Sequence, residues 1–500
     1  MDSYDAIIYG NDLSALITAY LILKKEKRVL LADPNERVGN FTDYYQKRRF
    51  TFNNIYNTLS FDSNDKDDLV SNIIQELNID TSFVSDNKLA HIISINKENN
   101  IKKEYILPVG IDDFSNKIEE YVPGSKNNII DFFSLAEECD TAIKYFLTYG
   151  IDEKEMKERF PNFVRVINKS VSEVLDYLKI PIEAQEILNF CWVYFSTSET
   201  DLAFIDYASF IYNLVKNNIK VPTENYEELS FEIFKKYLNG GGNYINNVTL
   251  NKIICLNKEV TGAIFNNEIY YTSNLITSLN PSKIYNSLIE KSEVPKEALR
   301  LCNKRVYDGS PFTIFLGLNR TAEELKLDSS KYFIWNNMDS DVEYNKMSSI
   351  NNDNSIVTIQ NYYRPDVSPE GTSIISIESY FFKNSFEEYL SCDNYKNSIA
   401  DITNNLITAF EEKTGIRIRD YIEEMQVITP IDYYIKYKDS SYFGYKLKPL
   451  DNTIMRYKNR IEEEYIKGLL FHGKYGILGG TFNNMLLTSK IIADKIDERR

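Results

Sequence analysis

The hydrophobic pattern of the first residues predicts a strand, a helix and a second strand. "YDAIIY" (Tyr4 to Tyr9) is a short apolar run rich in β-forming residues, and Gly10 stops it. The segment from Leu13 to Leu23 is apolar nearly all round, as in a helix buried between a sheet and its neighbours. "RVLLAD" (Arg28 to Asp33) reads as a second buried strand. This order predicts a βαβ unit with parallel strands and a right-handed crossover.

The rest of the chain divides into a helical middle and further strands. From Pro108 to about Leu238, apolar residues recur three and four apart, which predicts helices. After "NGGGN" (Asn239 to Asn243), three runs separated by Asn-rich turns predict a three-strand meander, and "NLITSLNP" predicts a strand that returns to the first sheet. Residues 300 to 440 mix strands with a helix around 385–412, and the last residues predict a strand, a glycine-rich turn and a closing helix.

This order of elements predicts an α/β protein with one lobe inserted into another. We expect a Rossmann-like lobe of the FAD/NAD(P)-binding type, built from the discontinuous segments 1–105, 239–285 and 455–500. An α+β substrate lobe would then hold residues 106–238 and 286–454.

Composition and charge exclude several classes of function. The 500 residues include 57 basic and 73 acidic side chains, a net charge of −16, which argues against nucleic acid or an anionic membrane as the main partner. The acidic start is unlike a signal peptide, and the apolar run from Ala15 to Leu23 is too short to span a bilayer, which leaves only peripheral membrane contact. Five scattered cysteines and only two histidines, His91 and His472, indicate reduced thiols in a cytoplasmic protein without a metal site.

Six segments in order carry a resemblance to a known family. The chain resembles phytoene-desaturase-like members of the FAD-dependent amine oxidase/desaturase superfamily along nearly its whole length. The segments are the first βαβ unit through "ERVGN", "VPGSKNNIIDFF", "SPFTIFLGLN", "RPDVSPEGTS", "TPIDYYIKY…YFGY" and "GLLFHGKYGILGG". The resemblance implies a two-lobe flavoprotein whose substrate lobe forms a lipophilic tunnel toward the isoalloxazine ring.

The first turn departs from the dinucleotide-binding fingerprint at its middle position. Gly10 keeps the glycine that makes the turn, and Ala15 is a small replacement for the one that lets helix and strand pack closely. Asp12 stands where backbone approaches the pyrophosphate, beside Leu13 and Ser14 at the start of the helix. Its repulsion of two phosphates is on the order of several kcal/mol, of which the helix N-terminus offsets about 0.5–2.

Other positions of the fingerprint are kept or changed one by one. Asp33 ends the second strand, where an acid bonds the adenosine ribose. The resemblance assigns Arg37 and Gly39 to the next cofactor motif, whose second glycine is Asn40 here. It also assigns Gly473, Gly479 and Gly480 to the C-terminal cofactor turn, where Lys474 replaces the family's acid.

Asp12 and Lys474 bear directly on whether FAD binds, since the family fold brings both turns to one phosphate site. In one hypothesis Lys474 neutralises the phosphates, Asp12 turns away and FAD binds in a shifted manner. In a second, Asp12 and Lys474 pair with each other and fill the pyrophosphate site. In a third, the two substitutions are independent.

The predicted function is FAD-dependent hydride transfer from a lipophilic substrate, with desaturation or isomerisation as the reaction. Because the cofactor supplies the reactivity, the sequence designates no catalytic residue. The alternative is a flavin-free pseudoenzyme, a binding or escort protein on the same scaffold, as the Rab GDP-dissociation inhibitors are, whose partner is a protein. Only the FAD-dependent enzyme would be yellow when purified.

Overall fold

The fold is described from a computed structural model. It describes residues 3–39, 41–42, 44–53, 58–96, 101–150, 152–306, 309–382, 395–437, 439, 441–449 and 465–498. Asn40, Cys392, the expected helix start near 385 and residues 455–464 of the expected dinucleotide lobe lie outside these ranges.

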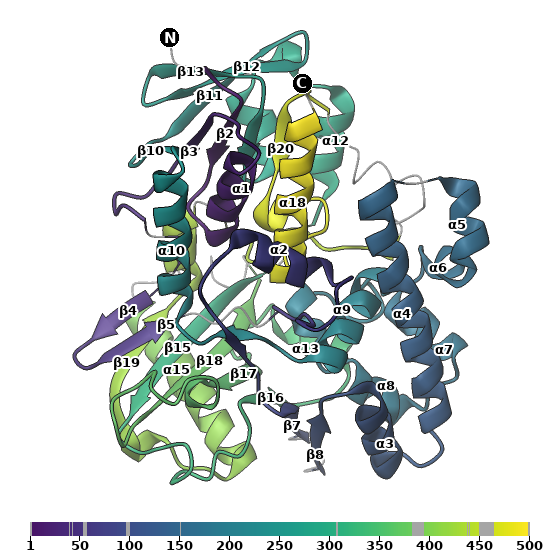
Figure 1. Cartoon of the computed structure of the whole chain (residues 1–500). Helices are drawn as coiled ribbons and strands as arrows, with labels where there is room; N and C mark the ends of the chain where they lie inside the picture. The colour runs from purple at the N-terminus through teal and green to yellow at the C-terminus, as the bar shows by residue number, and fades with distance from the viewer. Residues whose placement is uncertain are drawn as a thin grey trace.

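A five-stranded parallel sheet begins with the predicted βαβ unit. β2 (Ala6–Tyr9) and β3 (Val29–Ala32) are parallel, and α1 (Leu13–Leu23) connects them, which confirms that prediction. The strand order is β10-β3-β2-β14-β20, with β10 (Asn243–Ile245), β14 (Leu275–Thr277) and β20 (Leu469–Phe471). α1 lies between α10 (Tyr226–Asn239) and α18 (Phe482–Glu498), as Figure 1 shows, and therefore has no polar face.

The predicted meander forms a second, smaller sheet. β11 (Leu250–Leu256), β12 (Glu259–Phe265) and β13 (Glu268–Thr272) are antiparallel, and β1 (Ser3–Tyr4) pairs with β13. The two-residue turns between them are Asn257-Lys258 and Asn266-Asn267, and all four residues have positive φ. Asparagine tolerates this conformation, which matches the right-handed twist of a hairpin. The Asn-rich turns therefore determine how the three strands pair.

A mixed seven-stranded sheet forms the other lobe, in the order β19-β15-β18-β17-β16-β7-β8. Its strands are β7 (Lys88–Asn96), β8 (Ile101–Pro108), β15 (Ser310–Leu318), β16 (Lys331–Trp335), β17 (Ser355–Ile359), β18 (Ser373–Phe381) and β19 (Ile422–Ile428). β7 runs parallel to β16 and antiparallel to β8, so residues 88–96 and 101–105 pair in this sheet and not in the parallel one. The expected lobe boundary at residue 105 therefore does not coincide with the division between the sheets. The sequence did not indicate this, because a pairing between residues more than 200 positions apart leaves no local signal.

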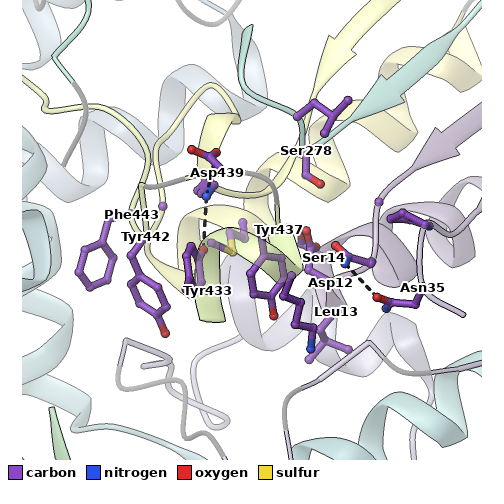
Figure 2. A pocket seen from close by; sticks show the side chains of 18 of the residues that line it. Asp12, Leu13, Ser14, Asn35, Ser278, Tyr433, Tyr437, Asp439, Tyr442 and Phe443 are labelled. Atoms are coloured by element: carbon purple, nitrogen blue, oxygen red, sulfur yellow. Dashed lines mark hydrogen bonds and ion pairs between the residues drawn. The ribbon is translucent and has the colours of Figure 1, made fainter. Parts of the chain in front are cut away.

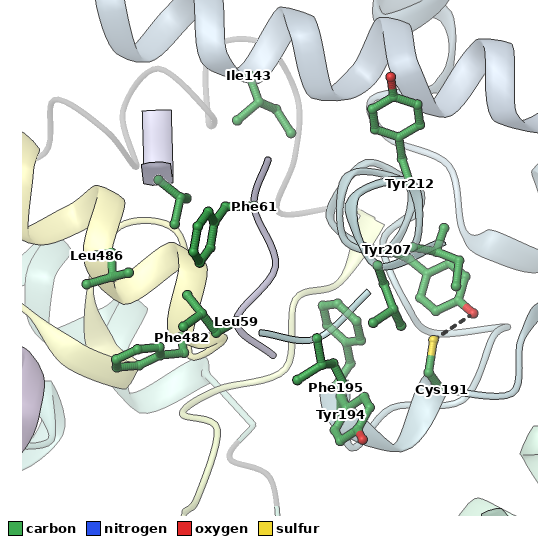
Figure 3. Close-up of a cluster of buried hydrophobic side chains, with 14 of the residues drawn as sticks. Leu59, Phe61, Ile143, Cys191, Tyr194, Phe195, Tyr207, Tyr212, Phe482 and Leu486 are labelled. Carbon is green, nitrogen blue, oxygen red and sulfur yellow. Dashed lines mark hydrogen bonds between the residues drawn. The ribbon is translucent and has the colours of Figure 1, made fainter. Parts of the chain in front are cut away.

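Helices cover the remaining surfaces of both sheets. The middle of the chain is helical as predicted, with α3 (Ile111–Tyr121), α4 (Lys126–Tyr149), α5 (Glu153–Arg159), α6 (Pro161–Val166), α7 (Val171–Tyr177), α8 (Ile182–Leu188), η1 (Trp192–Phe195) and α9 (Phe204–Asn217). Leu59, Phe61, Phe482 and Leu486 belong to the same buried cluster as Tyr194, Phe195 and Tyr207, which joins α18 to this helical block (Figure 3). α15 (Tyr395–Thr414) packs apolar side chains on the seven-stranded sheet.

Shorter elements complete the described chain. They are β4 (Tyr44–Lys47), β5 (Phe50–Asn53), α2 (Leu69–Leu77), β6 (Phe83–Val84), β9 (Val221–Pro222), α11 (Pro281–Lys283), η2 (Ile284–Leu288), η3 (Lys291–Glu293), α12 (Lys296–Lys304), α13 (Ser340–Lys346), η4 (Gln360–Tyr362), η5 (Arg419–Tyr421), α16 (Pro430–Tyr437) and η7 (Gly473–Tyr475). The cysteines at 139, 191, 255 and 302 are free, as expected. Within the described ranges, every helix is too short or too polar to cross a bilayer.

Candidate functional site

A cavity opens where three parallel strands end. β2, β14 and β20 all present their carboxyl ends at one edge of the sheet, the usual ligand position in such folds. The cavity measures about 660 Å³ and begins at the turn between β2 and α1, which is residues 10–14. In Figure 2, Asp12, Leu13 and Ser14 lie at one end, Tyr442 and Phe443 at the other, and Tyr433 and Tyr437 between them.

The two glycine turns meet at the start of the cavity, as the sequence predicts. A Cβ on Gly10 would lie 2.9 Å from the Ala15 Cβ and 3.0 Å from the Ser278 Oγ, so only glycine fits there. Gly473 has φ +63°, and a Cβ on it would lie 3.2 Å from the Ser14 Oγ. Close approach of the two turns therefore explains both glycines.

Asp12 caps helix α1 with its own side chain. Its backbone is extended, its Oδ1 accepts the Ala15 N–H at 2.9 Å, and Ser14 donates its hydroxyl to the same carboxylate. The Ser14 Oγ also lies 3.0 Å from the His472 Nδ1. His472 is fully buried, and burial lowers its pKa. An aspartate that interrupts the fingerprint is thus a regular N-cap.

Lys474 pairs with an acid that the sequence did not single out. Its Nζ lies 3.0 Å from Asp439 Oδ2, and it donates hydrogen bonds to the Tyr433 hydroxyl and the Ser441 carbonyl. The Tyr475 hydroxyl donates to the same Asp439 at 2.5 Å. The hypothesis that Asp12 and Lys474 pair and fill the pyrophosphate site is therefore wrong, because Asp439 lies close enough to hold the lysine.

Asp33 lies behind the cavity wall. Its carboxylate accepts the Asn35 N–H and the Tyr244 hydroxyl, each at 2.8 Å, and Tyr244 also receives the Gly39 N–H at 3.3 Å. Burial raises the pKa of Asp33 to about 6 despite these bonds. Lys436 of α16 faces it, and burial lowers the pKa of this lysine to about 8. A ribose at this point would meet the Asp33 carboxylate, which already accepts hydrogen bonds from Asn35 and Tyr244.

The sequence-predicted site residues fall into two groups. Those that line the cavity are Gly10, Asp12, Leu13, Ser14, Lys474 and Gly480. Those that lie beside it are Ala15, Asp33, Arg37, Gly39, Gly473 and Gly479. Arg37 is exposed and stacks on the Tyr44 ring at 4.6 Å, while Gly39 and Gly479 have φ of +74° and +91° and shape their turns.

Helix α16 and the loop after it form the wall opposite the turn. Pro430 starts the helix, and Thr429 and Asp432 exchange hydrogen bonds there in the manner of a capping box. The loop packs against the C-terminal turn so closely that a Cβ on Gly480 would overlap the Phe443 carbonyl. This wall lies in the segment "TPIDYYIKY…YFGY", whose composition gave no indication that it faces the cavity.

The far end of the cavity is lined by Tyr194, Glu378, Tyr380, Tyr442 and Phe443. Glu378 is the one residue of β18 that is not fully buried. Sequence reasoning missed it, although a lone acid in the apolar strand "SIISIESYFF" was a usable signal.

The cavity fits a dinucleotide in its size and in most of its lining. Ligand cavities commonly measure about 300–1,000 Å³. Among the described residues, no acceptor is found for the backbone N–H groups of Leu13 and Ser14, which are the donors that a helix start offers to phosphate. Lys283, Lys436 and Lys474 also line the cavity. The carboxylate of Asp12 is the one feature at the turn that opposes an anion.

The parallel sheet, the paired glycine turns and the inserted seven-stranded sheet define the class: a Rossmann-like α/β fold. No protein-family model matches the chain. It is similar to all-trans-retinol 13,14-reductase of Danio rerio, 22% identical over 96% of this chain and 85% of the relative, and to prolycopene isomerase 2 of an Oncidium hybrid cultivar, 21% identical over 86% and 73%. A redesigned putrescine oxidase has the same fold, with a TM-score of 0.67, 10% identity and complete coverage of both chains. The likeness to the retinol reductase and the prolycopene isomerase agrees with the resemblance that the sequence motifs indicate, and the likeness to putrescine oxidase shows a shared fold.

Proposed function

We propose that this protein is an FAD-dependent oxidoreductase or isomerase that acts on a lipophilic substrate with conjugated double bonds. The cavity carries the proposal, because it joins a phosphate-binding turn to an aromatic end within one continuous space. The curated relatives support the substrate class, since their names specify a retinol reductase and prolycopene isomerases.

The residues at the turn would hold the diphosphate of the cofactor. The backbone N–H groups of Leu13 and Ser14 would bind it, Gly10 would admit it, and Lys474 would add positive charge. When bound, the flavin would supply hydride transfer, and the protein would orient it and exclude water. We further propose the lobe boundaries 1–105, 239–285 and 455–500 for cofactor binding, with residues 88–96 and 101–105 contributed to the seven-stranded sheet of the other lobe.

A titration of the purified protein with FAD tests this proposal. Wild-type protein is expected to bind FAD and acquire the visible flavin spectrum. Asp12→Asn keeps an N-cap and removes the carboxylate charge, so its affinity should rise about tenfold or more, since the repulsion is worth several kcal/mol. Gly10→Ala is the matched negative control, because its Cβ would meet Ala15 and Ser278.

The alternative, a flavin-free binding protein, predicts a different outcome. A colourless protein whose Asp12→Asn variant also stays colourless after incubation with FAD would refute the enzyme proposal. The geometry gives that alternative little support, because the side chains expected to fill the site, Asp12 and Lys474, do not pair.

A further inference from the structure

Two buried titratable side chains, one acidic and one basic, lie at the aromatic end of the cavity and influence each other electrostatically. Glu378 comes from β18 and lines the cavity, whereas Lys331 comes from β16 and is 1% exposed behind it. The Lys331 Nζ lies 3.4 Å from the Tyr194 hydroxyl, and Tyr194 lines the cavity too. Three polar groups from three separate elements thus converge at an otherwise apolar surface.

We propose that Glu378 is the catalytic acid and base of this cavity, with Lys331 and Tyr194 as the positioning residues that return its proton. The proposal rests on the proposed function, since it names a role in the conversion of a conjugated lipophilic substrate. In a reduction, the O–H bond of Glu378 breaks and the π electron pair forms a C–H bond with this proton. A bound reduced flavin would be the two-electron donor and would supply the hydride for the adjacent carbon. In a desaturation the same carboxylate would accept the proton, and the hydride from the adjacent carbon would go to oxidised FAD.

The electrostatic surroundings suit a group that both gives and takes a proton. Burial raises the pKa of Glu378 to about 7, with Lys331 opposing the shift. Burial also lowers the pKa of Lys331 to about 7, with Glu378 opposing that shift. Transfer of a proton between two groups with matched pKa values costs little free energy, and a catalytic pKa near the working pH is the most effective.

The titratable groups around the two side chains include Glu343, which lines a smaller cavity together with Glu378 and is paired with Lys346. Cys191 and Tyr194 approach from η1 and the residue before it, Tyr363 from the end of η4 and Tyr442 from the loop after α16. Burial raises the pKa of Tyr194, Tyr363 and Cys191. The strands on either side of β18 place Thr313 and Ile356 opposite Glu378. Lys331 is the charged partner that opposes the raised pKa of Glu378.

A purely structural pair would be sealed from the cavity on both sides. A buried ion pair contributes little net stability compared with apolar side chains of the same size, so its presence needs another reason. Here Lys331 is buried away from the cavity whereas Glu378 lines it. This arrangement suits an acid that gives a proton to a bound substrate and a lysine that returns the proton to it.

Infrared titration of the FAD-loaded protein tests the pair without a substrate. The carbonyl band of a protonated carboxylic acid is expected to titrate near pH 7 in wild type and to be smaller in Glu378→Gln by one carboxyl group. In Lys331→Met the same band should titrate at higher pH, because the positive neighbour is lost. Glu199→Gln is the matched control, since Glu199 also has a pKa raised to about 7 but does not line the cavity. It should remove one carboxyl band as well, but Lys331→Met should still shift the remaining band in the Glu199→Gln background and should leave it unmoved in the Glu378→Gln background. A Glu378→Gln band equal to that of wild type would overturn the proposal.

Turnover of all-trans-retinol with reduced FAD, and of prolycopene, tests the catalytic role. Glu378→Gln should lower kcat by about 100-fold or more while KM changes little, as loss of an acid-base group does. Lys331→Met should shift the pH profile upward and Glu199→Gln should behave as wild type. Normal turnover in Glu378→Gln would overturn this inference and leave the proposed function intact. A wild-type protein that binds FAD but converts neither probe would overturn the substrate class, and with it this role for Glu378.

Discussion

Removal of either member of the Lys474–Asp439 pair should destabilise the protein by several kcal/mol. The two side chains are 11% and 9% exposed and lie 3.0 Å apart, so at an effective dielectric constant of 20 their attraction is roughly 5–6 kcal/mol. Desolvation offsets part of this attraction, and loss of one partner of a buried pair costs about 3–5 kcal/mol because the other charge stays unpaired. A chain of 500 residues that melts as one unit loses about 1 °C in Tm per kcal/mol, so Lys474→Met should melt about 3–5 °C lower.

A double-mutant cycle by differential scanning fluorimetry measures the pair itself. Lys474→Met and Asp439→Asn should each lower Tm, and the double variant should lose clearly less than their sum. Lys474→Asp restores the acid typical of the family but places it beside Asp439, so it should be worse than Lys474→Met and be rescued by Asp439→Lys. Lys157→Met, at the exposed Lys157–Glu153 pair, should leave Tm unchanged. Strictly additive losses at positions 474 and 439 would refute the pairing argument.

Two further variants test the turn and the wall of the cavity. Burial raises the pKa of Asp33 from its ordinary 3.8 to about 6, so ionisation of this side chain lowers stability as pH rises from about 4 to 6, by at most about 3 kcal/mol. Asp33→Asn should remove this loss, and a difference in Tm between wild type and variant that is equal at both ends of the pH range would contradict the argument. Gly480→Ala should lower Tm by about 1–3 °C, because the added Cβ meets the rigid Phe443 carbonyl, whereas Gly371→Ala meets no atom within 4 Å and should show only the smaller cost of its positive φ.

Elements with a local signal were predicted well. The bounds of α1 follow from an unbroken apolar run between Asp12 and Lys24, and the meander follows from its asparagine turns. The turns at Gly10 and Gly473 meet in the structure as predicted, because the family resemblance implies this contact.

What the sequence could not reveal were contacts between distant segments. The partner of Lys474 is Asp439, in a segment with no charge pattern to mark it, and the strand that receives β7 lies more than 200 residues downstream. The sequence predicts that Asp12 repels a diphosphate, and the structure adds that its carboxylate caps helix α1, which sequence reasoning did not consider. Glu378 was overlooked because its strand was read for hydrophobicity alone.

The arrangement of the parallel sheet has a consequence for how the chain is made. Its edge strand β20 begins only at Leu469, and α1 needs α18, the final helix, to cover one of its sides. During synthesis, β14 therefore waits through nearly 200 residues with an unpaired edge and an uncovered apolar helix beside it. The first βαβ unit is therefore synthesised well before the strand and helix that complete its sheet, so nascent chains should depend on chaperones that bind apolar segments.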